Sequence, residues 1–281
     1  MAGPLVSVEW LRERLGEPGL VVADCRYRLG EPGAGELLWR ESHIPGAAFI
    51  DVDRDLAAPP GERGRHPLPE PADFEAVARR AGIGPGTAVI AYDEAAEGGA
   101  ARLWWLLRHF GHTGAAVLDG GLRAWREAGG PMRGGQEEIE PGTFHAREAI
   151  TGDTASVEEL AATDPPLLLD ARAPERYRGE TEPIDSVAGH IPGAHNLPFV
   201  EAAPDGQFLP PAELRARLKA AGVGPDAHFV AYCGSGVTAC ILVLAAEVAG
   251  LEGARLYPGS WSEWSRRGLP AEGGGPSAAR H

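Results

Sequence analysis

Short apolar runs alternate with stretches of helical periodicity along most of the chain. The apolar runs are 20–23, 88–92, 167–169 and 229–232. The helical stretches are 72–81, 101–108, 212–221 and 239–246. Strands that alternate with helices in this way form parallel sheets with helices on both faces. The pattern therefore predicts an α/β fold.

Four landmarks of the first half recur in the second half in the same order. The pairs are Asp24-Cys-Arg26 with Asp170-Ala-Arg172, His43-Ile-Pro-Gly-Ala47 with His190-Ile-Pro-Gly-Ala194, Tyr92-Asp93 with Tyr232-Cys233, and 118–125 with 256–264. Matched order and near-equal spacing predict a duplicated domain. We expect a first copy at 1–126, a linker at 127–153, a second copy at 154–270, and a frayed tail at 271–281.

The second copy carries a candidate nucleophile between a strand and a helix. The apolar run ends at Tyr232, and Cys233-Gly-Ser-Gly-Val-Thr238 precedes the next helical stretch. Ligand sites of parallel sheets lie at the carboxyl ends of strands. A glycine-rich turn before a helix can direct backbone N–H groups at an anion, here from Gly234, Gly236, Val237 and Thr238. Such a setting favours a thiolate and, after sulfur transfer, a persulfide.

The first copy has no such nucleophile. Asp93 stands where the second copy has Cys233, and acidic residues follow it. A carboxylate cannot carry sulfur as a persulfide. We therefore expect the first copy to be a catalytically inactive scaffold.

Composition narrows the classes of partner and compartment. The net charge is −14 and the pI is near 5.1, which argues against nucleic acid and anionic membranes as partners. No apolar run has the length of a membrane span, and no signal peptide is apparent at the N-terminus. The three cysteines, Cys25, Cys233 and Cys240, do not form a disulfide framework. A cytoplasmic protein is expected.

These motifs resemble the tandem-domain rhodanese superfamily over essentially the whole chain. The resemblance implies two rhodanese-like domains and a sulfurtransferase that works through a Cys233 persulfide without a cofactor. The implied partners are a small sulfur donor and an acceptor that is a thiol, a thioredoxin-like protein or cyanide.

The loop after Cys233 is similar to that of superfamily members that use 3-mercaptopyruvate, which carry Cys-Gly-Ser-Gly-Val-Thr. Members that use thiosulfate typically have basic residues there. The mercaptopyruvate members also carry a second substrate arginine that is absent from 179–185. Thiosulfate therefore remains the alternative donor.

The resemblance also implies roles for individual residues. Arg176 is similar to the arginine that binds the carboxylate or sulfonate of the donor, a task that suits its planar fork. Asp53 and His66 resemble a pair from the first copy that reaches the site. With Ser235 they are expected to assist proton transfer.

Other prominent residues are more simply interpreted as structural. His43 and His190 belong to turns, Asp170 and Arg172 to a buried ion pair, and Cys25 and Cys240 to the core, with a redox role for Cys240 left open. No histidine and cysteine spacing indicates a metal site, and none of the glycine-rich stretches fits a nucleotide motif.

Two other functions are weighed against sulfur transfer. A cysteine phosphatase would need an arginine six residues after the nucleophile, where this chain has Ala239. A non-enzymatic binding module would not require the intact Cys233 loop.

Overall fold

The computed structural model describes residues 3–147, 149–226 and 228–273, and the chain forms two compact units. Unit 1 comprises Met1–Ala58, Leu68–Thr151 and Ala203–Phe208. Unit 2 comprises Pro59–Pro67, Gly152–Ala202 and Leu209–His281. Each unit thus contains a short segment from the other half of the chain. Residues 274–281 of the expected tail lie outside the described residues.

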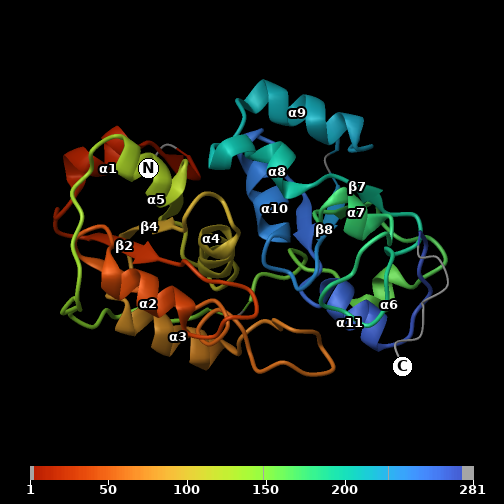
Figure 1. The fold of residues 1–281 in the computed structure, drawn as a ribbon, viewed down its shortest axis with the longest axis horizontal. Coiled ribbons are helices and arrows are strands. Elements are labelled where there is room, and N and C mark those ends of the chain that lie inside the picture. Colours follow the sequence, from red (N-terminus) through yellow and green to blue (C-terminus); the bar gives the residue numbers. More distant parts are fainter. Residues whose placement is uncertain (1–2, 148, 227, 274–281) are drawn as a thin grey trace. The chain divides into compact units, whose positions relative to one another are not determined.

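Unit 1 contains a five-stranded parallel sheet in the order β1-β5-β4-β2-β3. Figure 1 labels two of its strands, β2 and β4. The strands are β1 (Leu5–Val6), β2 (Leu20–Asp24), β3 (Ala47–Phe49), β4 (Ala88–Tyr92) and β5 (Ala115–Leu118). The helices are α1 (Val8–Arg14), α2 (Ala34–Glu41), α3 (Pro71–Arg80), α4 (Gly99–His109) and α5 (Gly121–Glu127), with the 3-10 turn η1 (Pro204–Gly206). Helix α4 packs on β4 and β5.

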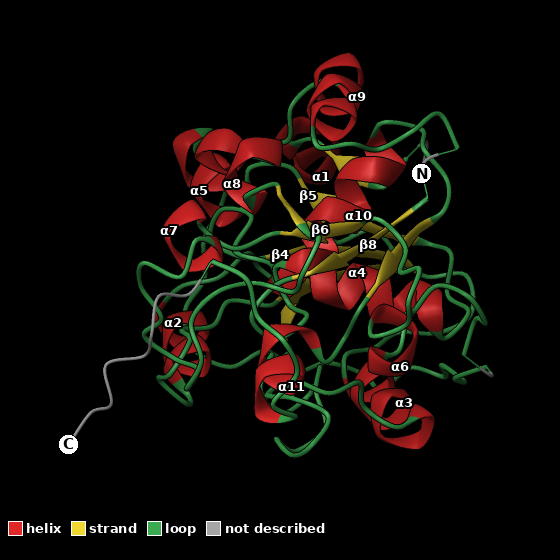
Figure 2. Ribbon diagram, turned by 90° about the vertical axis from the view of Figure 1, so that its right-hand side faces the viewer, coloured by secondary structure: helices red, strands yellow, loops and turns green. Residues whose placement is uncertain are grey.

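Unit 2 repeats the plan with a four-stranded parallel sheet in the order β7-β6-β8-β9. Figure 2 labels two of its strands, β6 and β8. The strands are β6 (Leu168–Asp170), β7 (His195–Asn196), β8 (Phe229–Tyr232) and β9 (Ala254–Leu256). The helices are α6 (Val157–Leu160), α7 (Pro174–Tyr177), α8 (Phe199–Ala202), α9 (Pro211–Ala220), α10 (Ala239–Val248) and α11 (Ser260–Arg266). The predicted α/β fold with two similar copies is confirmed.

A buried ion pair explains the recurring Asp-x-Arg pattern. In unit 1, Arg26 Nη2 donates to Asp24 Oδ2 at 2.7 Å and to the Ser42 carbonyl at 2.7 Å. In unit 2, Arg172 Nη2 donates to Asp170 Oδ2 at 2.6 Å and to the Gly189 carbonyl at 2.7 Å. Each arginine thereby joins a strand end to the turn before a His-Ile-Pro-Gly segment. This arrangement agrees with the predicted structural role of the ion pair.

The two turn histidines are structural, as expected. His43 Nδ1 lies 2.6 Å from the Trp39 carbonyl oxygen, and its Nε2 lies 3.0 Å from Glu137 Oε1. His190 Nδ1 lies 2.7 Å from the Tyr177 carbonyl oxygen. Both rings are buried and satisfied by these neighbours.

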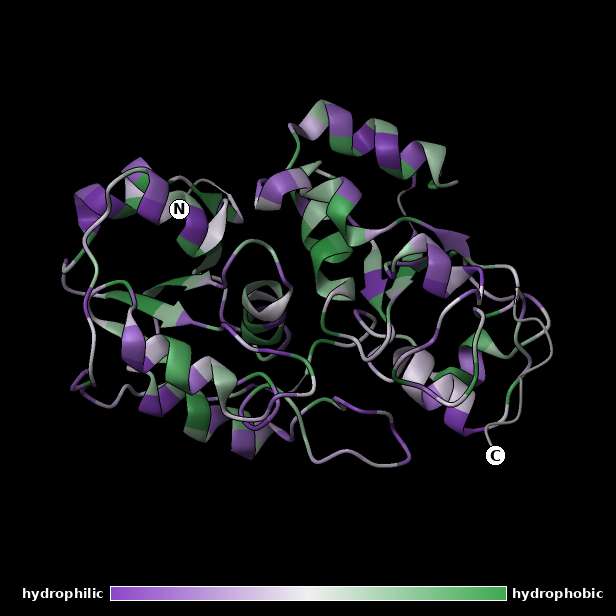
Figure 3. Ribbon diagram, in the orientation of Figure 1, coloured by the Kyte–Doolittle hydropathy of each residue, from purple (hydrophilic) through white to green (hydrophobic). Residues whose placement is uncertain are grey.

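Helix α10, which follows the candidate nucleophile, is the central helix of unit 2. Its residues from Ala239 to Ala246 are all buried, and Figure 3 shows it as hydrophobic along most of its length. It packs on β8 and β9 on one side and on α8 and α9 on the other. Among the described residues, the longest apolar helices are still too short to span a bilayer.

Candidate active site

Cys233 begins the loop between β8 and α10 and is 2% exposed. The backbone N–H of Gly236 donates to Cys233 Sγ at 3.1 Å. The N–H of Cys233 itself donates to Ser260 Oγ at 3.1 Å. The thiol is therefore held at the end of a buried strand, with a backbone donor directed at its sulfur.

The glycine at position 236 is required by two features of the loop. Its φ is +78°, a left-handed conformation that disfavours side chains, and an added Cβ would collide with the Pro258 carbonyl oxygen. This tight curvature turns the Gly236 N–H back toward Cys233.

Further loop amides are available to an anion. Within the described residues, no protein acceptor is found for the backbone N–H groups of Gly234, Ser235, Val237 and Thr238. A loop with several uncommitted N–H groups next to a thiol provides donors for a bound anion or a persulfide. The geometry agrees with the predicted anion-binding role, which itself stays a prediction.

The segment 59–67 brings first-half residues into unit 2. Gly64 has φ +102°, and an added Cβ would lie 2.7 Å from the Gly259 carbonyl oxygen. The next residue, Arg65, donates its backbone N–H to Ser262 Oγ at 3.0 Å. His66 follows, and its Nδ1 lies 2.7 Å from Ser235 Oγ, two residues after the nucleophile. The structure thus brings His66 and Ser235 together, as the resemblance implied.

Charged side chains form a paired group beside this loop. Arg176 Nη2 donates to Glu182 Oε1 at 2.7 Å, and Arg65 Nη1 donates to Asp185 Oδ1 at 2.8 Å. Asp185 Oδ2 also lies 3.6 Å from Arg176 Nη2. A Cβ added to Gly234 would lie 3.6 Å from Arg176 Nη1 and 3.1 Å from Arg65 Nη2, so both guanidinium groups lie near the loop. Of the two, only Arg176 was predicted from the sequence.

Ser260 is a second residue that sequence reasoning missed. Its φ of +52° is unusual for a residue with a side chain, and its hydroxyl donates to the Tyr257 carbonyl at 2.8 Å. The equivalent residue of unit 1 is Gly121, whose φ is +60°. A serine where the copy has glycine was the available signal, because only the serine supplies an acceptor for the Cys233 N–H.

The equivalent loop of unit 1 holds a carboxylate. Asp93 Oδ2 accepts the N–H groups of Gly98 at 3.0 Å and Ala100 at 3.2 Å. Burial raises the pKa of Asp93 above its ordinary value, and these donors oppose that effect. This loop is satisfied internally and contains no thiol, which agrees with the expected inactivity of the first copy. Asp53 also belongs to unit 1, and its catalytic role stays a prediction.

The other two cysteines are buried, as expected. Cys25 follows β2, and burial raises the pKa of its thiol well above the ordinary value. Cys240 Sγ donates to the Gly236 carbonyl oxygen at 3.4 Å from within α10. A redox role for Cys240 stays untested.

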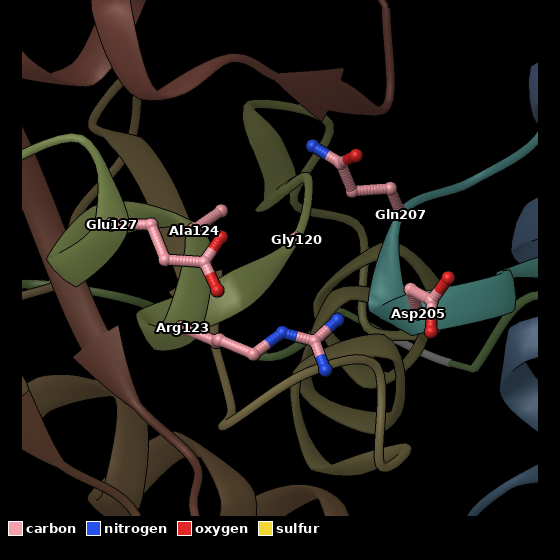
Figure 4. Close-up of a pocket in the computed structure, with 6 residues that line it drawn as sticks. All are labelled: Gly120, Arg123, Ala124, Glu127, Asp205 and Gln207. Carbon is pink, nitrogen blue, oxygen red and sulfur yellow. The ribbon is translucent and has the colours of Figure 1, made fainter.

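A surface pocket of unit 1 is lined by residues that do not include Asp93. It is lined by residues of α5 and of the turn η1, among them Arg123, Glu127 and Asp205 (Figure 4). Arg123 extends from α5 toward the turn that carries Asp205. The pocket contains no thiol, and within the described residues no cluster of three metal-ligating side chains is found.

Comparisons with known proteins agree with this architecture. The model of the rhodanese-like domain matches residues 7–128 and 153–267. The chain therefore belongs to the rhodanese-like family, of which it carries two copies.

Related proteins extend this assignment to enzyme class. A protein of Pseudomonas aeruginosa, "Probable 3-mercaptopyruvate sulfurtransferase", is 45% identical over 267 residues, covering 92% of this chain and 94% of that protein. Human 3-mercaptopyruvate sulfurtransferase is 36% identical, covering 95% and 94%. A Mycobacterium tuberculosis protein, SseB, carries the provisional name of a thiosulfate sulfurtransferase and is 42% identical, with 89% of each chain covered.

A solved structure leads to the same class. The 3-mercaptopyruvate sulfurtransferase of Leishmania major superposes with a TM-score of 0.82 at 31% identity, covering 94% of this chain and 75% of that one. The predicted class of enzyme, a sulfurtransferase, is confirmed by these relatives.

Proposed function

We propose that the chain transfers sulfane sulfur from 3-mercaptopyruvate to a thiol acceptor through a persulfide on Cys233. The observation that carries this proposal is the Cys233 loop, in which the Gly236 N–H donates to Sγ. Several further N–H groups of the loop have no protein acceptor among the described residues. The relatives named for 3-mercaptopyruvate support the choice of donor. A thioredoxin-like protein or cyanide could also accept the sulfur.

The reaction is balanced without a cofactor. The Cys233 thiolate attacks the donor sulfur, and the bond between that sulfur and carbon breaks with its electron pair on carbon. The enolate of pyruvate then takes up the proton that the donor thiol gives up, which leaves a persulfide on Cys233. We propose that Ser235 and His66 move this proton, supported by their 2.7 Å contact, and that Asp53 assists them.

The carboxylate of the donor is proposed to bind Arg176, and the loop amides of Gly234, Gly236, Val237 and Thr238 are proposed to stabilise the transferred sulfur on Cys233. Thiosulfate is a second candidate donor, because the stretch 179–185 lacks an arginine and SseB is named for that substrate. With thiosulfate, a sulfur–sulfur bond would break and sulfite would leave with the electron pair. A reducing compartment such as the cytoplasm suits a protein whose three cysteines are all free.

The test compares kcat/KM for 3-mercaptopyruvate and thiosulfate on one preparation, with Cys233→Ala as the inactive variant. Mass spectrometry after donor treatment should show an added mass of about 32 Da on Cys233, one covalently captured sulfur atom. Cys240→Ala is the matched control and should retain the adduct. Absence of the adduct with both donors would contradict the proposal.

A further inference from the structure

Two guanidinium groups border the same point of the nucleophile loop. A Cβ built on Gly234 would lie 3.1 Å from Arg65 Nη2, and 3.6 Å and 3.7 Å from Nη1 and Nη2 of Arg176. Gly234 directly follows Cys233 in the chain. A small molecule that reaches the thiol over Gly234 therefore meets both arginines.

Arg65 is held at this point by its backbone as well as by its side chain. Its N–H donates to Ser262 Oγ at 3.0 Å, and Gly64 before it allows close approach to Gly259. These contacts fix the start of the side chain, so the guanidinium does not depend on a single ion pair for its position.

Asp185 orients the guanidinium of Arg65. Its Oδ1 and Oδ2 accept from Arg65 Nη1 and Nη2 at 2.8 Å and 3.5 Å, and the Asp185 side chain is only 9% exposed. This aspartate lies at the end of the stretch 179–185, where the sequence lacks the second substrate arginine expected from the resemblance. Asp185 of the stretch 179–185 thus binds Arg65, which comes from the segment 59–67.

The group retains capacity to bind an anion. The Nε of Arg65 is buried and has no hydrogen-bond partner among the described residues. A buried N–H without an acceptor is costly, and a bound carboxylate near it would offset that cost. Glu182 also pairs with Arg172, which is bound to Asp170, so the three arginines of this group face three carboxylates and their charges balance. A group without excess positive charge suits a monoanion better than a dianion.

We propose that Arg65 is a donor-binding residue that, together with Arg176, holds the carboxylate of the keto-acid donor over Gly234. Asp185 acts as its positioning residue. This inference rests on the proposed function and adds a residue that recognises the carboxylate of the donor. Arg65 fills the role of the arginine that 179–185 does not provide.

The test is the kinetics of Arg65→Gln and Arg65→Lys in the full chain. Loss of one charge-assisted hydrogen-bonding group should raise KM for 3-mercaptopyruvate by about 10- to 100-fold, with a much smaller change in kcat. Lysine keeps the charge but loses the planar fork, so its KM should be intermediate. Arg63→Gln removes the same charge from an exposed position of the same segment and should leave KM unchanged.

Inhibition by pyruvate supplies a readout of binding alone. Its inhibition constant should rise in Arg65→Gln by about the same factor as KM, because the product carries the same carboxylate. An unchanged KM and inhibition constant in both Arg65 variants, with an active wild-type enzyme, would overturn the role of Arg65. An equal rise in KM for thiosulfate would overturn its preference for a carboxylate. Failure of the wild type to form a persulfide with either donor would instead refute the proposed function.

Discussion

The Nδ1 atom of His66 lies 2.7 Å from Ser235 Oγ, although 169 positions separate the two residues in the chain. Both side chains are buried, at 5% and 6% exposure. A hydrogen bond of this length between a ring nitrogen and a hydroxyl is suited to moving a proton close to Cys233.

We predict that Ser235→Ala and His66→Gln lower kcat with 3-mercaptopyruvate by about 100-fold, within the range usual for loss of proton transfer. With thiosulfate the reduction should be much smaller, because sulfite leaves without a proton being delivered to carbon. Steady-state kinetics with both donors measures this difference. Equal losses with the two donors would indicate that the pair supports the loop and does not transfer a proton.

Two substitutions of Ser260 should distinguish the effect of backbone strain from the effect of the lost hydrogen bond. Ser260→Gly relieves the positive φ but removes the acceptor of the Cys233 N–H, whereas Ser260→Ala keeps the strain and also loses the acceptor. We expect both variants to form the persulfide more slowly. The alanine variant should be less stable than the glycine variant by about 1–2 kcal/mol, the usual cost of a left-handed residue. Urea unfolding checks this order, and equal stabilities would contradict it.

We predict that Gly236→Ala lowers the stability of the fold much more than the matched substitution Gly193→Ala does. Gly193 has φ +76°, nearly the value of Gly236, but an added Cβ there meets nothing within 4 Å. Gly193→Ala should therefore cost about 1 kcal/mol through its φ alone. Gly236→Ala adds a collision with Pro258 and should lose several times as much stability, along with most persulfide formation. Thermal unfolding and mass spectrometry measure the two effects.

The pH dependence of stability should reveal the buried carboxylate of unit 1. Burial raises the pKa of Asp93, so the folded chain keeps this proton at pH values where the unfolded chain has lost it. Its contribution to stability is therefore present at low pH and is lost as pH rises through the raised pKa. Asp93→Asn should gain stability relative to wild type as pH increases above about 4. A stability difference that does not change with pH would contradict this.

The repeated motifs made much of the fold predictable. Asp-x-Arg and His-Ile-Pro-Gly recur because each arginine bonds both its strand end and the turn before the histidine. The Cys233 loop was predictable for a similar reason, since its chemistry lies within six consecutive residues. The local sequence pattern was sufficient to predict a contact wherever the interacting groups are close in the sequence or occur in both copies.

Arg65 and Ser260 could not be assigned in this way. Arg65 reaches Gly234 because the segment 59–67 belongs to unit 2, which no periodicity of the first half indicates. The serine at 260, where the other copy has Gly121, was a signal in the sequence, but its contact with the Cys233 N–H also depends on how the chain enters α11. Both residues depend on long-range geometry, which composition and spacing do not encode.

The location of Pro59–Pro67 in unit 2 has a consequence for any attempt to divide the chain into its two copies. A polypeptide restricted to the second copy would possess the nucleophile but would lack both Arg65 and His66. The first half of the chain therefore supplies unit 2 with residues that the second copy does not contain. A cut between the two copies would not separate the two units, because Pro59–Pro67 would remain on the fragment that lacks Cys233.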